Sequence, residues 1–305
     1  MRAVWSFWSK PFRAGTGWPW RSPVHHLLAW GLSVRLARSH YPDTVLITDT
    51  PGRALLVDGL GLRFGEVSTA LDQLDDADPE LWMLGKLLAY SLQQEPFVHL
   101  DADVFLWRPL PVSLVSAPVF AQHLDEFPVD KWGGPLVIED AFLRAGLALP
   151  VEWRWIRSQS RRTFPEANLG IFGGTDSCFT RYYARSALDL ALNPGHAAAW
   201  ASIPHGVDVS PVVEQFMFTA YAAYHRFAPD SPHRGLSVRY LFPTQAEAYN
   251  PEYARRLGYT HLLGDAKHHP ETTARLAERV RSEDPEFYAR CQAIVGGLVP
   301  ESAVT

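Results

Sequence analysis

Short apolar segments that fit β-strands alternate along this chain with longer segments of helical periodicity. The clearest strand candidate covers residues 96–100, which follow a predicted helix over residues 80–94 and run directly into Asp101. Such alternation favours an α/β fold of the Rossmann-like kind, with a mainly parallel sheet and helices on both faces. Ligands of these folds bind beyond the carboxyl ends of the strands, so the residues that follow strands are the first candidates for a site.

The predicted elements form a single domain over residues 1–305, with a helical extension from about residue 270 to residue 305. Residues 125–165 are rich in Gly, Pro, Trp and charge, which predicts loops around one helix. The other predicted strands cover residues 2–8, 45–48, 62–67, 118–124, 169–172, 237–242 and 259–263. The other predicted helices cover residues 24–40, 137–146, 177–192, 211–226 and 270–295.

Composition narrows the class of partner. A net charge of −5 argues against nucleic acid, whose binding proteins present a basic face. The sequence has no run of 18 apolar residues and no apolar segment of the signal-peptide type, so we expect a cytoplasmic protein without a transmembrane segment. The cluster Arg154, Arg157, Arg161 and Arg162 is typical of a solvated face, but leaves open a peripheral contact with membrane headgroups or an anionic acceptor.

The strongest chemical motif is Asp101-Ala102-Asp103, at the end of the apolar strand candidate. In an extended segment, residues i and i+2 point the same way, so both carboxylates can face one hard divalent cation, Mn²⁺ or Mg²⁺. Such an ion can neutralise the charge that grows on a leaving diphosphate.

A second motif, His261-Leu-Leu-Gly264-Asp-Ala-Lys267, lies near the end of the chain. An imidazole can complete the coordination of a carboxylate-bound metal ion. Gly264 permits close approach of the backbone to a phosphate, and Lys267 offers a positive charge to the same diphosphate. Asp49 ends another predicted strand and is a candidate for a ribose or base contact, although strand-end turns explain such a residue equally well.

Together these segments resemble the retaining GT-A glycosyltransferases of family 8, the group that includes glycogenin and the lipopolysaccharide galactosyltransferases. Four blocks carry the resemblance, namely Lys86-Leu-Leu-Ala-Tyr-Ser-Leu in the predicted helix, Leu100-Asp101-Ala102-Asp103, Asn168-Leu-Gly170-Ile-Phe and His261-x-x-Gly264-x-x-Lys267. The sequence departs from the family after the first strand, where Ser6 and Trp8 stand in the region that would hold a uridine.

The resemblance implies a GT-A-like fold and an enzyme of the hexosyltransferase type, which transfers a sugar with retention from a nucleotide-sugar, most simply a UDP-sugar, to an acceptor that the sequence does not name. It implies that Asp101, Asp103 and His261 bind the metal ion. Lys86 and Asn168 would contact the donor, and Lys267 its diphosphate. Glu214 and Gln215 would face the reacting sugar and stabilise its transition state.

Two other functions stay open at this point. A phosphohydrolase of the haloacid-dehalogenase type also places Asp-x-Asp after a buried strand, with the first Asp as nucleophile, but here Phe105 occupies the position of its usual Thr. A non-catalytic protein that binds carbohydrate or nucleotide-sugar is the other alternative, although a lectin has no need of groups that bind a diphosphate.

Overall fold

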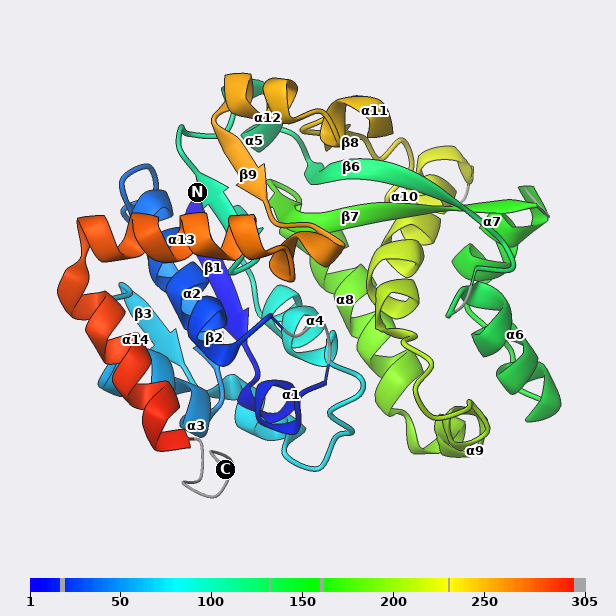
Figure 1. Cartoon of the computed structure of the whole chain (residues 1–305). Helices are drawn as coiled ribbons and strands as arrows, with labels where there is room; N and C mark the ends of the chain where they lie inside the picture. Colours follow the sequence, from blue (N-terminus) through cyan, green and yellow to red (C-terminus); the bar gives the residue numbers. More distant parts are fainter. Residues whose placement is uncertain (17–19, 132, 160–161, 230, 299–305) are drawn as a thin grey trace.

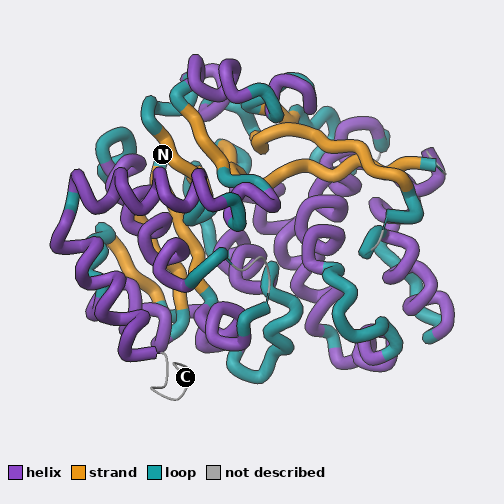
Figure 2. Tube along the Cα trace, in the orientation of Figure 1, coloured by secondary structure: helices purple, strands orange, loops and turns teal. Residues whose placement is uncertain are grey.

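A computed structural model describes residues 1–16, 20–131, 133–159, 162–229 and 231–298 of the chain (Figures 1 and 2). The strands are β1 (Arg2–Phe7), β2 (Thr44–Thr48), β3 (Glu66–Ser68), β4 (Phe97–Leu100), β5 (Val104–Leu106), β6 (Val119–Pro128), β7 (Thr163–Gly174), β8 (Val238–Tyr240) and β9 (Tyr259–His261). The α-helices are α1 (Ser9–Ala14), α2 (Pro23–Arg38), α3 (Thr50–Arg53), α4 (Leu84–Ser91), α5 (Val112–Val115), α6 (Pro135–Arg144), α7 (Val151–Gln159), α8 (Ser177–Leu192), α9 (Ala197–Ala201), α10 (Met217–Phe227), α11 (Gln245–Ala248), α12 (Pro251–Leu257), α13 (Pro270–Glu283) and α14 (Pro285–Leu298).

Seven strands form one sheet in the order β3-β2-β1-β4-β7-β6-β8, and β5 pairs with β9 in a separate two-stranded sheet. The strands β3, β2, β1 and β4 run parallel, as does the pair β6 and β8, whereas β7 runs antiparallel to both of its neighbours. The predicted α/β class with a mainly parallel sheet is therefore confirmed. The change of direction at β7 brings the end of β4 beside the middle of a long antiparallel pair.

Alternating residues of the central strands bury two separate cores, one on each face of the sheet. In β1, Val4 points into the core that α4, α8 and α10 cover, while Ala3 and Trp5 point into the core that α2, α13 and α14 cover. Figure 1 shows these two groups of helices on opposite sides of the parallel strands. Helices on both faces leave the strand ends as the place where a cavity can open.

Residues 125–165, predicted as loops around one helix, contain that helix as α6 but also regular structure that was not predicted. The strand β6 continues to Pro128, β7 already begins at Thr163, and α7 follows α6 between them. The long pairing of β6 with β7 includes Asp125 opposite Glu166. Polar side chains at these positions hid the strands from a prediction based on apolar residues, because they face a cavity.

The C-terminal extension is two helices instead of one. Pro285 has no backbone N–H to continue α13, and the carboxylate of Asp284 accepts a hydrogen bond of 2.9 Å from the backbone N–H of Phe287 to begin α14. Both helices pack against α2, as Figure 1 shows at the left of the view. The extension therefore closes one core of the sheet.

Candidate metal centre and its cavity

Asp101 and Asp103 lie in a turn directly after β4. The backbone N–H of Asp101 donates to the carbonyl of Gly170 at 2.9 Å, and the backbone N–H of Val104 closes the turn on the carbonyl of Asp101 at 3.0 Å. The extended arrangement predicted from the i, i+2 spacing is therefore wrong. The turn nevertheless leaves the two carboxylates close together, with oxygen atoms within 4.8 Å of each other.

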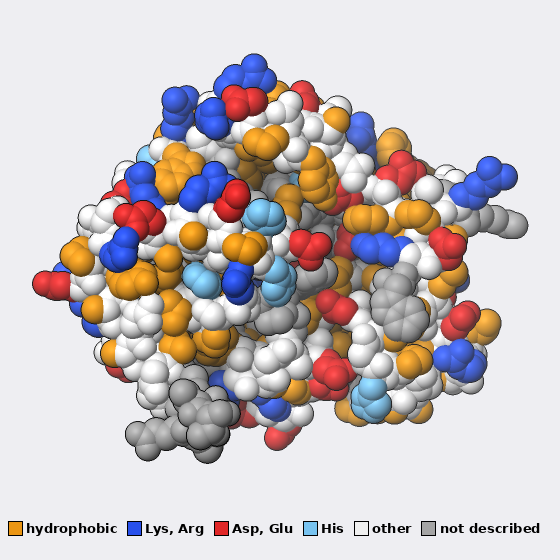
Figure 3. Space-filling view, viewed as in Figure 1, with side chains coloured by type: hydrophobic (Ala, Val, Ile, Leu, Met, Phe, Trp, Pro, Cys, Tyr) orange, Lys and Arg blue, Asp and Glu red, His pale blue; other side chains and the backbone are white. Residues whose placement is uncertain are grey.

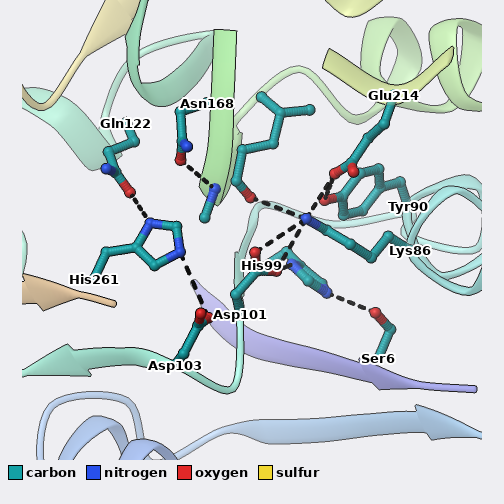
Figure 4. A network of polar contacts seen from close by, with 12 residues as sticks. Ser6, Lys86, Tyr90, His99, Asp101, Asp103, Gln122, Asn168, Glu214 and His261 are labelled. Carbon is teal, nitrogen blue, oxygen red and sulfur yellow. Dashed lines mark hydrogen bonds and ion pairs between the residues drawn. The ribbon is translucent and has the colours of Figure 1, made fainter. Parts of the chain in front are cut away.

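His261 reaches this turn through the pairing of β5 with β9. Val104 stands opposite His261 in that antiparallel pair, and the backbone N–H of Leu262 donates to the carbonyl of Asp103 at 3.1 Å. Ligand atoms of Asp101, Asp103 and His261 all lie within 4.8 Å of one another (Figure 4). The predicted meeting of an acidic pair with an imidazole from far along the chain is confirmed, and these three residues can hold a metal ion.

The hydrogen bonds of His261 fit a metal ligand. Its Nδ1 lies 2.7 Å from the amide oxygen of Gln122, which can only accept, so Nδ1 carries a proton and Nε2 is the ring nitrogen left for a metal ion. That Nε2 lies 3.5 Å from the Oδ1 atom of Asp103. Either a proton on Nε2 or a metal ion between these two atoms satisfies both. A partner that fixes the tautomer in this way is typical of metal-binding histidines.

Lys267 is the second group that contacts the acidic pair. Its ammonium lies 2.7 Å from the Oδ2 atom of Asp103, at the end of the short turn that Gly264 begins with a φ of +48°. Burial alone would raise the pKa of Asp103, but the charges of Lys267 and His261 hold that pKa well below its usual value. Asp103 is therefore ionised and ready to bind a cation.

Lys86 lies behind the other carboxylate. Its ammonium is 3.0 Å from Asp101, 2.7 Å from Glu214 and 3.4 Å from the carbonyl oxygen of Leu169 (Figure 4). Burial favours its neutral form, but the charges of Asp101 and Glu214 prevail and raise the pKa of Lys86 above its usual value. Lys86 is thus charged and holds Asp101 in place.

Glu214 is not among the residues that line the cavity over the metal ligands. Its side chain is fully buried, and its carboxylate accepts hydrogen bonds from Lys86 and, at 3.3 Å, from the hydroxyl of Tyr90. Gln215, the next residue, lines the cavity. Of the predicted pair, only Gln215 is placed to contact a ligand.

A cavity of about 580 Å³ opens over the metal ligands and receives most of the predicted donor-binding residues. Figure 3 shows a hollow near the centre of this face, bordered by histidine and acidic side chains. The cavity wall includes, among the predicted residues, Ser6, Trp8, Lys86, Asp101, Asp103, Asn168, Gln215, His261, Gly264 and Lys267. These residues come from the carboxyl ends of β1 and β4, from α4, from β7, from the helical turn before α10, and from the end of β9 with the segment that follows it.

Ser6 and Asn168 already make hydrogen bonds within the protein. The Oγ atom of Ser6 lies 2.9 Å from Nε2 of His99, and the amide oxygen of Asn168 accepts from the backbone N–H of Gly170 at 3.0 Å. The amide nitrogen of Asn168 is thereby turned away from its own strand. A ligand in the cavity can use it as a hydrogen-bond donor.

Asp49 has a structural role instead of the predicted ribose or base contact. It is only 1% exposed, and its carboxylate accepts hydrogen bonds from the backbone and hydroxyl of Ser9 and from the backbone N–H of Gly52. It begins α3 and fastens that helix to the segment after β1. Within the arginine cluster, Arg157 pairs with Glu139 at 2.7 Å, and Arg161 lies outside the described residues.

The residues that line the two ends of the cavity were not predicted from the sequence. One end is aromatic, with Phe12, Trp20, His26 and Trp30. The indole of Trp30 donates to Nε2 of His26 at 3.0 Å, and burial lowers the pKa of His26 to about 4, so this imidazole is neutral at physiological pH. The spacing of His26 and Trp30, one helical turn apart in α2, was the available signal, but it also fits an ordinary buried helix.

The other end is polar and lies on β6 and β7. Asp125 and Glu166 line it together with Phe127, Lys131 and Tyr249. Only the register of the two strands places these residues together, and register cannot be read from a single sequence when both strands are polar on one face.

A family model matches residues 1–294. The chain belongs to DUF6734, a family of unknown function. A comparison with curated proteins finds no match. Within the part of this DUF6734 chain that the structure describes, no helix combines the length and the apolar character that crossing a membrane requires.

Proposed function

We propose that this protein is a metal-dependent glycosyltransferase that takes a sugar from a nucleotide-sugar, most simply a UDP-sugar, and transfers it to an acceptor hydroxyl. The observation that carries the proposal is the convergence of Asp101, Asp103 and His261, with ligand atoms within 4.8 Å of one another, in the wall of a 580 Å³ cavity. Carboxylates suit Mn²⁺ and Mg²⁺ alike, while the imidazole favours Mn²⁺.

Charge at the centre fits a diphosphate. A divalent cation held by Asp101, Asp103 and His261 would supply Lewis-acid stabilisation of the departing nucleoside diphosphate. Lys267 would exchange its contact with Asp103 for a phosphate oxygen, since its ammonium is a flexible point charge near the cavity wall. Gly264 adds no side chain to obstruct that approach.

The aromatic end of the cavity supplies a place for the nucleobase. Phe12 and His26 lie with ring centroids 4.9 Å apart, and the ammonium of Lys267 is 6.0 Å from the centroid of the Trp20 ring. Flat rings beside the diphosphate position favour stacking with a base. Because Lys267 adjoins both, base and diphosphate can be bound next to each other, as one nucleotide requires.

The buried Lys86–Glu214 pair bears on the stereochemical course. Resemblance to family 8 implies retention, which an enzyme can achieve with a carboxylate nucleophile. Glu214 is buried behind Lys86 and cannot reach a bound sugar without breaking that pair. We therefore propose that Glu214 positions Lys86 and Asp101, while Gln215 and Asn168 face the donor sugar.

The test is release of nucleoside diphosphate from a panel of UDP-sugars with Mn²⁺, with Mg²⁺ and with EDTA. We expect Mn²⁺-dependent release, and at least a hundredfold loss in Asp103→Asn, because that variant removes a charged metal ligand. Asp265→Asn is the matched control, since Asp265 is an exposed carboxylate in the turn after His261 and is not one of the three candidate ligands. Turnover of an aryl phosphate with Mg²⁺, with no consumption of nucleotide-sugar, would instead establish the phosphohydrolase, and metal-dependent binding without any release would establish the non-catalytic alternative.

A further inference from the structure

A second pair of carboxylates lies in the cavity, away from the metal ligands. Asp125 of β6 and Glu166 of β7 are directly opposite each other in the antiparallel pair, and both line the cavity. They are 5% and 3% exposed, respectively. Two acidic side chains this deeply buried on neighbouring strands are costly unless a partner satisfies them.

Hydrogen bonds within the protein do not fully satisfy the oxygen atoms of these two carboxyl groups. The Oδ2 atom of Asp125 lies 3.1 Å from Nε2 of His123, and the hydroxyl of Tyr249 is close enough for Asp125 to help raise the pKa of Tyr249, after burial. Among the described residues, none donates a well-formed hydrogen bond to the buried Oδ1 atom of Asp125. Glu166 has one distant partner, the ammonium of Lys131 at 3.5 Å. A molecule in the cavity that brings hydrogen-bond donors would satisfy both carboxyl groups.

The strand geometry sets where such a molecule would lie. Gly170, Asn168 and Glu166 are alternate residues of β7, so their positions share one face of the strand. At about 3.3 Å per residue, Glu166 lies about 7 Å from Asn168 and about 13 Å from Gly170, against which the His261 ring packs. With the donor sugar beside Asn168, as proposed above, Glu166 would lie about one sugar ring further from the metal centre.

Charge determines what kind of molecule fits. Two carboxylates repel an anionic ligand, and Lys131, which lies 3.3 Å above the ring of Phe127, disfavours a second cation. Burial raises the pKa of Glu166 to about 7, with Lys131 acting in the opposite direction, so this carboxyl group can both donate and accept near neutral pH. Tyr249 and Phe127 add aromatic faces to the wall. Hydroxyl donors combined with apolar C–H faces are the properties of a neutral sugar.

We propose that Asp125 and Glu166 form the acceptor subsite, and that it binds a neutral, hydroxyl-rich sugar residue next to the donor sugar at Asn168. Calling this sugar the acceptor rests on the proposed glycosyl transfer. The binding of a neutral sugar at Asp125 and Glu166 is testable without turnover.

The experiment measures binding and transfer separately. Binding is followed by saturation-transfer NMR with methyl glycosides of glucose, galactose and mannose, in the presence of Mn²⁺ and UDP, and methyl glucuronoside serves as the anionic comparison. We expect the wild type to bind at least one neutral glycoside and to bind the glucuronoside more weakly. We expect Asp125→Asn and Glu166→Gln to weaken the neutral glycoside about tenfold or more, because each changes a buried hydrogen-bonding carboxyl group.

Glu152→Gln is the matched control, since Glu152 is also a buried carboxylate but is not part of the cavity wall. Its glycoside affinity should equal that of the wild type, and the affinity of all variants for UDP should stay within about twofold. The inference is overturned if the wild type binds none of the neutral glycosides, or if Asp125→Asn and Glu166→Gln bind them unchanged. It is also overturned if these two variants lose UDP-sugar binding instead, because the carboxylates would then serve the donor. Failure of UDP-sugar cleavage in the wild type would count against the proposed function alone.

Discussion

A Cβ atom placed on Gly170 would lie 2.3 Å from Cε1 and 2.4 Å from Nδ1 of the His261 ring. The imidazole therefore packs directly on the backbone of β7, in space that only glycine leaves open. The amide oxygen of Gln122 accepts a hydrogen bond from the same ring at 2.7 Å. The position of one candidate metal ligand is thus set by a missing side chain 91 positions earlier in the sequence.

The first prediction follows from that contact. Gly170→Ala should displace the His261 ring and weaken Mn²⁺ binding about tenfold to a hundredfold, the range known for changes that reorient a metal ligand. Isothermal titration with Mn²⁺ measures this affinity, and thermal unfolding in EDTA measures the fold. Gly296→Ala is the control, because a Cβ there meets no atom within 4 Å. Unchanged Mn²⁺ affinity in Gly170→Ala would show that His261 is not a ligand.

The second prediction concerns the buried Lys86–Glu214 pair. Lys86→Met should reduce the free energy of unfolding by about 3 kcal/mol, because it leaves Glu214 buried without a cation. Glu214→Gln should reduce it by less, because Lys86 keeps its ion pair with Asp101. The double variant should lose clearly less than the sum, with a coupling energy on the order of 1–3 kcal/mol. Urea unfolding of all four proteins in EDTA completes the cycle. Additive losses would mean that the two side chains do not act as a pair.

A third prediction uses the pKa of Glu166, which burial raises from 4.5 to about 7. Between these pH values the native protein keeps a proton that the unfolded chain has released, so stability falls as pH rises through this window. The loss amounts to about 3 kcal/mol at most. Glu166→Gln should remove it, and urea unfolding at pH 5 and at pH 8 tests this. If the variant and the wild type lose the same stability over that range, Glu166 titrates as an ordinary surface carboxyl group.

A fourth prediction separates the two lysines of the cavity. Lys267→Met should weaken binding of UDP in the presence of Mn²⁺ about tenfold, since it removes a charge-assisted hydrogen bond to the diphosphate. Lys131→Met, at the opposite end of the cavity, should leave UDP affinity unchanged. Titration calorimetry with Mn²⁺ held at saturation measures both. Equal affinities in the two variants would place the diphosphate somewhere other than beside Lys267.

The sequence was sufficient for those parts of the fold in which local signals and burial agree. Helix α8 has the predicted bounds, residues 177–192, because Asp176 caps its start and an apolar stripe covers one side. Strand β4 was recognisable from the apolar residues Phe97, Val98 and Leu100, and all four of its residues are buried. By contrast, β5 has three residues and exists because β9 pairs with it, so nothing local identifies it.

The candidate site divides in the same way. Asp101, Asp103 and His261 could be predicted because carboxylates and imidazoles are common metal ligands. The position of Asp101 and Asp103 directly after an apolar strand was the second signal. Asp49 is also a carboxylate directly after a strand, yet it accepts hydrogen bonds from Ser9 and Gly52 and serves the fold. Hydrogen-bond partners of this kind depend on which loops meet, which is settled by packing and is not visible in the order of residues.

The strands β5 and β9 are separated by about half of the chain. They must pair before Asp101, Asp103 and His261 lie together. A chain that stops before Tyr259 offers two carboxylates and no imidazole, and it also lacks the helices α13 and α14 that close one core of the sheet. The third candidate ligand and the cover of that core are therefore supplied by the same end of the chain.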